Sequence, residues 1–194
     1  RRDDLKALCA AFGTTSGAPM LHIKGVTPEA HIAPVEGALH IEIGAVQFCD
    51  AWEELNRGSV QIDLVSIGSP HASAEELQRM ATLFASRPCH PATDVIVTLG
   101  RDVLRVARED GTAARLQDLG VTLLPDLCWC SIVEPVFPPK ARGVITNSGK
   151  FAHYSYGISG RHARLGSLSD CVEAAITGKA PEGLPGWLSG QWGR

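Results

Sequence analysis

The sequence predicts an α/β fold built on a largely parallel sheet. Short apolar segments rich in β-branched residues have the composition of buried strands, at 62–67, 95–99, 120–124 and 143–146. Segments with helical hydrophobic spacing lie between them, and Gly or Pro marks several of the boundaries. Strands that alternate with helices usually pair in parallel through right-handed crossovers, so the order of the elements favours this class.

The N-terminal part of the chain is expected to contain two helices, a further helix start at 25–30 with Thr27 as cap and Pro28 at the first helical position, and two short strands. Residues 3–12 and 45–57 carry apolar side chains at helical spacing. Residues 20–23 form a short apolar run, and residues 39–43 alternate as Leu-His-Ile-Glu-Ile, the pattern of a half-exposed strand.

The remainder of the chain is expected to place a helix after each strand or between two of them. These helices are predicted at 73–84, 102–109, 113–119, 149–154 and 169–176. Ser73 and Glu76 have the spacing of a capping box, which satisfies free N–H groups at a helix start. Residues 1–180 are expected to form one α/β domain, and residues 181–194 a Pro- and Gly-rich tail that links or docks elsewhere.

Composition argues against several classes of protein. A net charge of −3 and a pI near 6.2 give no reason to expect nucleic acid or a membrane as partner. The six cysteines are scattered through helix and strand candidates, unlike those of a disulfide scaffold, so a reducing cytoplasm is the expected compartment. Cys9, Cys49 and Cys171 are expected to be small buried hydrophobes. The chain begins without Met inside a predicted helix, so we expect a fragment of a longer protein.

Polar side chains follow each predicted strand at the point where it ends. In chain order they are Ser69 and His71, then Arg101 and Asp102, then Asp126 and Cys128, and finally Asn147, Ser148 and Lys150. The carboxyl ends of parallel strands line one crevice, which is where such sheets bind ligands. We therefore expect these side chains to converge on one edge of the sheet.

Each group also has a purely structural interpretation. Cys128 and Cys130 could supply thiolates to iron, zinc or an iron–sulfur cluster, or a nucleophile, but their spacing alone favours two buried thiols beside a core tryptophan. His71 could act at the site or only fix its loop. Ser148 and Lys150 stand at a predicted helix start, which suits a carboxylate or phosphate but also ordinary capping.

Four of these motifs together resemble the aconitase X family. They are residues 25–30 (GVTPEA), 68–73 (GSPHAS), 126–128 (DLC) and 146–154 (TNSGKFAHY). The resemblance runs across most of the chain and implies an aconitase-like domain with three layers, α/β/α. It also implies a hydro-lyase that converts cis-3-hydroxy-L-proline to Δ1-pyrroline-2-carboxylate, or, as in an archaeal branch, a mevalonate 5-phosphate dehydratase. The chain would be the C-terminal part of the large catalytic region, with the first part of that region and a small swivelling domain as its partners.

The resemblance also implies a cofactor and roles for residues. An iron–sulfur cluster or iron would be held by Cys128, with Ser69 beside it. The resemblance places a cysteine at position 69 in the archaeal branch, so Ser69 favours the hydroxyproline type. Asn147, Ser148 and Lys150 would bind the substrate carboxylate, with Ser148 and Lys150 stabilising the developing anion, and His71 would orient a ligand or relay a proton.

Two other functions remain open at this point. The chain could be a non-catalytic α/β module that binds a small anion at the strand ends. It could also be a thiol-redox protein that uses Cys128 and Cys130. An aconitase-type site is assembled between domains, so the chain by itself is expected to be inactive.

Overall fold

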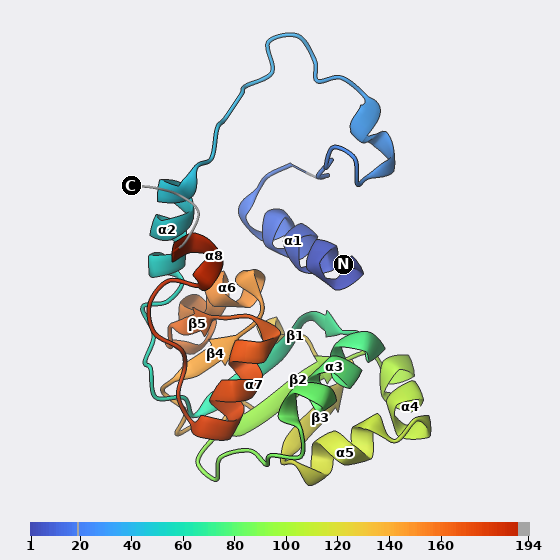
Figure 1. Ribbon diagram of the computed structural model, residues 1–194, viewed down its shortest axis with the longest axis vertical. Coiled ribbons are helices and arrows are strands. Elements are labelled where there is room, and N and C mark those ends of the chain that lie inside the picture. The colour runs from blue at the N-terminus through green and yellow to red at the C-terminus, as the bar shows by residue number, and fades with distance from the viewer. Residues whose placement is uncertain (19, 190–194) are drawn as a thin grey trace.

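A computed structural model describes residues 1–18 and 20–189, except the side chain of Ala30 (Figure 1). Its centre is a five-stranded sheet in the order β3-β2-β1-β4-β5, and every neighbouring pair is parallel. The strands are β1 (Leu64–Ala72), β2 (Asp94–Leu99), β3 (Val121–Pro125), β4 (Val144–Thr146) and β5 (Ala163–Leu165). The predicted parallel sheet is confirmed, and β5 is an addition that its short, Arg-containing sequence did not indicate.

Four helices cover one face of the sheet and enclose the larger core (Figure 1). They are α3 (Ala74–Phe84), α4 (Arg101–Glu109), α5 (Thr112–Asp118) and α7 (Leu168–Thr177). Val65 and Val97 on the strands share this core with Leu77 and Phe84 of α3. The Ser73 capping box is present, because Ser73 Oγ accepts from Glu76 N while the Glu76 carboxylate accepts from Ser73 N.

The opposite face carries α6 (Gly149–Ser159) and the loop at 129–141, which begins with the short 3-10 helix η2 (Trp129–Ser131). Trp129 is buried there with its ring centroid 5.1 Å from that of Phe151, and its Nε1 donates to Ile67 O at 2.8 Å. The predicted α/β/α arrangement in three layers is therefore confirmed, although loop residues provide much of the third layer.

The N-terminal part lies outside these layers. Helix α1 (Arg2–Thr15) contacts α6 and the end of β1. A long segment follows, with one 3-10 helix, η1 (Pro28–His31), and it leads to α2 (Ala45–Glu54). The strands predicted at 20–23 and 39–43 are wrong: both segments are unpaired, and Figure 1 shows this part of the chain looping away from the sheet. A strand needs a partner, and in the described part of the chain no sheet edge reaches them.

The tail folds back on α2 rather than extending away. Its last described element is the short helix α8 (Gly186–Ser189), where the Trp187 ring packs edge-on to Phe48 at 6.0 Å. Trp52 Nε1 donates to Gly183 O at 3.2 Å. Residues 190–194 of the predicted tail lie outside the described residues.

The cysteine predictions are only partly correct. Cys171 is buried, and burial raises its pKa, whereas Cys9 is exposed and Cys49 half-buried. Helix α1 contacts the domain only along part of its surface, so helical spacing alone misplaced Cys9. In the part of the chain that the structure describes, no helix is both long and apolar enough to span a membrane.

Candidate functional site

The ends of three strands meet at one edge of the sheet, as the parallel arrangement predicts. The Ser148 hydroxyl, after β4, donates to Ser69 O in β1. His71, also in β1, places its ring Nε2 2.8 Å from Leu127 O, after β3. The end of β1 therefore contacts the loops that follow β3 and β4, because β1 lies centrally in the sheet.

Ser148 is a fixed part of this edge. It is buried, and its Oγ accepts a hydrogen bond from Phe151 N at 3.0 Å, which caps α6. Its own proton goes to Ser69 O, so both functions of the hydroxyl are used within the protein. The capping interpretation of Ser148 is thus observed, and a role toward substrate remains a prediction.

Ser69 has the opposite character. Its side chain is 3% exposed, yet its Oγ makes no hydrogen bond to any described residue. The backbone before it is held tightly, because Gly68 has φ +103° and its carbonyl accepts from Thr98 Oγ1 at 2.7 Å. A buried hydroxyl without a partner costs about 1–3 kcal/mol. Ser69 is therefore the residue of this edge that most needs a ligand.

The Cys128-Trp129-Cys130 segment is part core and part surface. Trp129 is buried, but both thiols are exposed, so the prediction of two buried thiols is wrong. Partial burial raises the pKa of Cys130, the neighbouring Cys128 raises it further, and the Lys150 ammonium acts in the opposite direction. These effects show that Cys128 and Lys150 both lie within electrostatic reach of Cys130.

Asp126 and Arg101 form an ion pair that sequence patterns did not reveal. Asp126 has φ +60°, and its carboxylate accepts from Arg101 N at 3.0 Å and Arg101 Nε at 2.5 Å. These hydrogen bonds from Arg101 lower the pKa of Asp126. The pairing depends on β2 and β3 being neighbours, a long-range feature without a local signal.

Lys150 and Asn147 are half-buried at the same edge, and neither side chain hydrogen-bonds another described residue. Both therefore remain available to a ligand. Their position at the start of α6 adds the positive end of the helix dipole, which favours an anion.

The donor set fits a metal only in part. Among residues 1–18 and 20–189, no group of three His, Cys, Asp or Glu side chains could hold a metal ion. This edge offers the exposed thiol of Cys128 and the unpartnered hydroxyl of Ser69. A metal here would need further ligands from outside the described residues.

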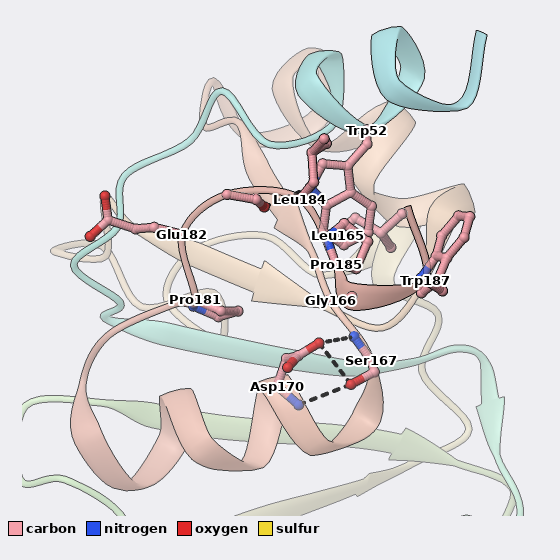
Figure 2. A pocket seen from close by; sticks show the side chains of 12 residues that line it. Trp52, Leu165, Gly166, Ser167, Asp170, Pro181, Glu182, Leu184, Pro185 and Trp187 are labelled. Atoms are coloured by element: carbon pink, nitrogen blue, oxygen red, sulfur yellow. Dashed lines mark hydrogen bonds between the residues drawn. The ribbon is translucent and has the colours of Figure 1, made fainter. Parts of the chain in front are cut away.

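A cavity of about 470 Å³ lies elsewhere, beyond the end of β5 (Figure 2). Trp52, Leu165 and Trp187 give it an apolar lining. Two of its polar residues are paired with each other: Ser167 N donates to Asp170 Oδ2 at 2.8 Å, and Asp170 N donates to Ser167 Oγ at 3.1 Å (Figure 2). None of the predicted site residues lines this cavity, so it is distinct from the strand-end site.

Comparison with known proteins gives consistent matches. The family model described as the aconitase X third domain matches residues 62–177, and that of the aconitase X second domain matches residues 1–53. The chain is 45% identical to the cis-3-hydroxy-L-proline dehydratase of Pseudomonas aeruginosa over 193 residues, covering 96% of this chain and 33% of the relative.

More distant relatives and a solved structure agree. The phosphomevalonate dehydratase large subunit of Methanocaldococcus jannaschii is 30% identical over 173 residues, covering 88% of this chain and 42% of the subunit. The crystal structure of Thermococcus kodakaraensis aconitase X (holo-form) has a TM-score of 0.78 and 28% identity, covering 90% of this chain and 44% of that one. The chain thus spans a third to less than half of the length of these relatives.

Proposed function

Because this chain belongs to the aconitase X family, we propose that it is part of a hydro-lyase that removes water from cis-3-hydroxy-L-proline. The 45% identity over 193 residues to a protein of that named activity carries the proposal. The convergence of Ser69, Ser148 and Lys150 on one edge supports it, since a small hydroxy acid needs a carboxylate site beside a group that activates its hydroxyl.

The alternative substrate is mevalonate 5-phosphate, the type of substrate named for the more distant relatives. Arginine is the side chain that most often binds phosphate in a bidentate, charge-assisted manner. At this edge Lys150 has no ion pair among the described residues, whereas Arg101 is paired with Asp126 at 2.5 Å. One available ammonium suits a carboxylate better than a phosphate, which favours the hydroxyproline substrate.

The chain's own residues would bind and orient the substrate. Lys150, Asn147 and the start of α6 would hold the substrate carboxylate, and the charge that develops next to it would be stabilised by the same groups. Ser148 fixes the backbone of Ser69 through its hydrogen bond. The His71 ring must donate from Nε2, because Leu127 O can only accept, so His71 holds the loop that carries Cys128.

Iron or an iron–sulfur cluster would be held by Cys128 and Ser69 together with ligands outside this chain. When bound, it supplies a Lewis acid that polarises the leaving hydroxyl. The exposed Cys128 thiol and the unpartnered Ser69 hydroxyl support this assignment.

The main partner would be the rest of the same polypeptide. The segment between α1 and α2 exposes apolar side chains that a folded protein normally covers, including Ile32, Val35, Leu39, Ile41 and Ile43. We propose that they pack against the missing part of the catalytic region, with a small swivelling domain completing the site. The free thiols of all six cysteines support a cytoplasmic location.

The test is an assay of the full-length protein, purified without air. We expect formation of Δ1-pyrroline-2-carboxylate from cis-3-hydroxy-L-proline and no dehydration of mevalonate 5-phosphate. Preference for the second substrate would contradict the assignment, and turnover of neither would favour a non-catalytic anion-binding module. The 194-residue chain alone should be inactive, because its described residues lack a complete metal site.

A thiol-redox function is the second candidate, favoured by the exposure of both Cys128 and Cys130. It requires a reversible disulfide between them. A thiol–disulfide titration followed by mass spectrometry of the peptide at 126–131 would detect it. We expect no such couple in the enzyme that carries its iron.

A further inference from the structure

Lys6 connects α1 to the end of β1. Its Nζ lies 2.6 Å from Glu76 Oε2 in α3 and 3.0 Å from Asp3 Oδ1 in its own helix, and it donates to His71 O at 2.9 Å. An ammonium has three N–H donors, so this arrangement uses all of them. The Lys6 side chain is 30% exposed and both carboxylates are 12% exposed. These pairs are thus better shielded from water than ordinary surface ion pairs.

The same cluster includes the capping box of α3. Ser73 Oγ donates to Asp3 Oδ2 at 3.0 Å, while Ser73 N donates to Glu76 Oε2 at 3.1 Å. Burial raises the pKa of Asp3, but hydrogen bonds from Lys6 and Ser73 outweigh it, so the net pKa is lowered. The carboxylate stays ionised, and α1 is held against the start of α3.

His71 links Lys6 to the loop after β3 at the candidate site. The backbone of His71 is bound by Lys6, and its ring bonds Leu127 O at 2.8 Å, directly before Cys128. Lys6 lies within the segment that matches the second domain of the family, whereas His71 and Leu127 lie within the third. One lysine thus joins the two matched segments at the predicted site.

We propose that Lys6 is a positioning residue for this site. It fixes the backbone at His71 and, through the His71 ring, the loop that carries Cys128. The effect on turnover rests on the proposed function, but the effect on Cys128 does not. If Lys6 only docked α1, its loss would lower stability without changing Cys128.

Arg87 offers a matched control. It also bridges two elements, with Nη2 3.0 Å from Glu173 Oε2 in α7 and 3.5 Å from Leu83 O in α3. It lies beyond the C-terminal end of α3, away from the strand ends that carry the candidate site. Arg87→Met therefore removes a comparable cation without touching the proposed path.

The experiment compares the full-length wild-type protein with the variants Lys6→Met, Lys6→Gln, Lys6→Arg and Arg87→Met. In metal-free protein, the alkylation rate of Cys128 by iodoacetamide is followed by mass spectrometry of its peptide. Thiol reactivity depends on access and environment, so Lys6→Met and Lys6→Gln should change this rate at least about threefold. Lys6→Arg and Arg87→Met should keep the wild-type rate. Lys6→Gln retains a hydrogen-bond donor and provides the measurement where Lys6→Met does not fold.

In the metal-loaded enzyme, Lys6→Met should lower kcat for cis-3-hydroxy-L-proline by about 10- to 100-fold, the range found for groups that orient metal ligands. Lys6→Arg should recover most of it. A wild-type alkylation rate in both Lys6→Met and Lys6→Gln would overturn the proposal, as would an equal change in Arg87→Met. If wild-type protein dehydrates nothing while the alkylation effect is present, the positioning role stands and the proposed function is wrong.

Discussion

Ser69 and Cys128 differ in burial although both lie at strand ends. Ser69 is buried with an unpartnered hydroxyl, and Cys128 is exposed with a free thiol. The difference arises from Trp129, which enters the core beside Phe151 and leaves the residues on both sides at the surface. The burial of Trp129 therefore leaves the thiols of Cys128 and Cys130 at the surface, where they can reach a ligand.

Replacing Cys128 and Cys130 one at a time should show which of the two thiols binds iron. In the full-length enzyme, Cys128→Ser should lose bound iron and lower kcat by about 100-fold or more, because a Lewis acid contributes several kcal/mol. Cys130→Ser is the matched control, and it should keep most of the bound iron and most of the wild-type kcat. Iron content by elemental analysis and turnover by product formation measure the two effects. Full iron occupancy in Cys128→Ser would refute the ligand assignment.

Asp126 should make stability depend on acid pH. Hydrogen bonds from Arg101 lower its pKa in the folded protein, whereas an unfolded aspartate titrates near about 4. Its contribution is therefore present above the unfolded pKa and is lost as pH falls through the folded one. The difference in free energy of unfolding between wild type and Asp126→Asn should be constant above about pH 5 and shrink below about pH 4.

Urea unfolding measured from pH 2 to 7 tests this expectation. Arg101→Gln removes the ion pair but keeps the backbone N–H that donates to Asp126, so it should weaken the same pH dependence without abolishing it. A difference between wild type and Asp126→Asn that is the same at pH 3 and pH 7 would contradict it.

The end of β1 shows how one element is shaped to bring the site together. Its register with β2 shifts between Ile67 and Ala72, so the strand bends where Ser69 and His71 lie. Gly68 permits this bend, because its φ is +103° and an added Cβ would lie 2.0 Å from Thr98 O. The close approach of the β1 and β2 backbones thus explains why residue 68 is glycine, whereas the sequence alone indicated only that a strand ends there.

Gly68→Ala should therefore destabilise the domain by more than about 2 kcal/mol, through left-handed strain and the clash with β2. Gly157→Ala is the control: it lies inside α6, its added Cβ has no atom within 4 Å beyond the adjacent residues and backbone of its own helix, and it should stabilise by about 0.5–1 kcal/mol. Denaturant unfolding of the full-length proteins compares them. Equal stability of Gly68→Ala and wild type would show that the bend can relax.

At the scale of the whole molecule, residues 39–43 have the alternating pattern of a strand but pair with no strand in the described part of the chain. Leu39, Ile41 and Ile43 are 84%, 69% and 65% exposed, and His40 lies 3.9 Å from Glu42, as expected on one face of an extended chain. The alternating pattern predicted a strand here, and that prediction is wrong because a strand needs a partner strand to pair with.

In the full-length protein we expect amide exchange of residues 39–43 to be at least about tenfold slower than in the 194-residue chain, because pairing protects N–H groups. Helix α4, which lies within the domain, should exchange equally in both and serves as the reference. Equally fast exchange of residues 39–43 in both proteins would show that this segment stays uncovered.

Local patterns were sufficient for the strands β1 to β4, the helices between them and the Ser73 capping box. Each depends on burial or hydrogen bonds within a few residues, and these leave a mark in periodicity and composition. The rule that parallel strands end at one edge of a sheet also predicted that the residues after these strands lie together.

Only the tertiary structure decided which strands are neighbours, and hence that Ser148 contacts Ser69 and that Asp126 pairs with Arg101. The tertiary structure also shows that Cys128 is exposed, that β5 is part of the sheet and that residues 39–43 are unpaired. These features depend on contacts between residues far apart in the chain. Periodicity records whether a side chain is buried, but it does not record which distant residue buries it.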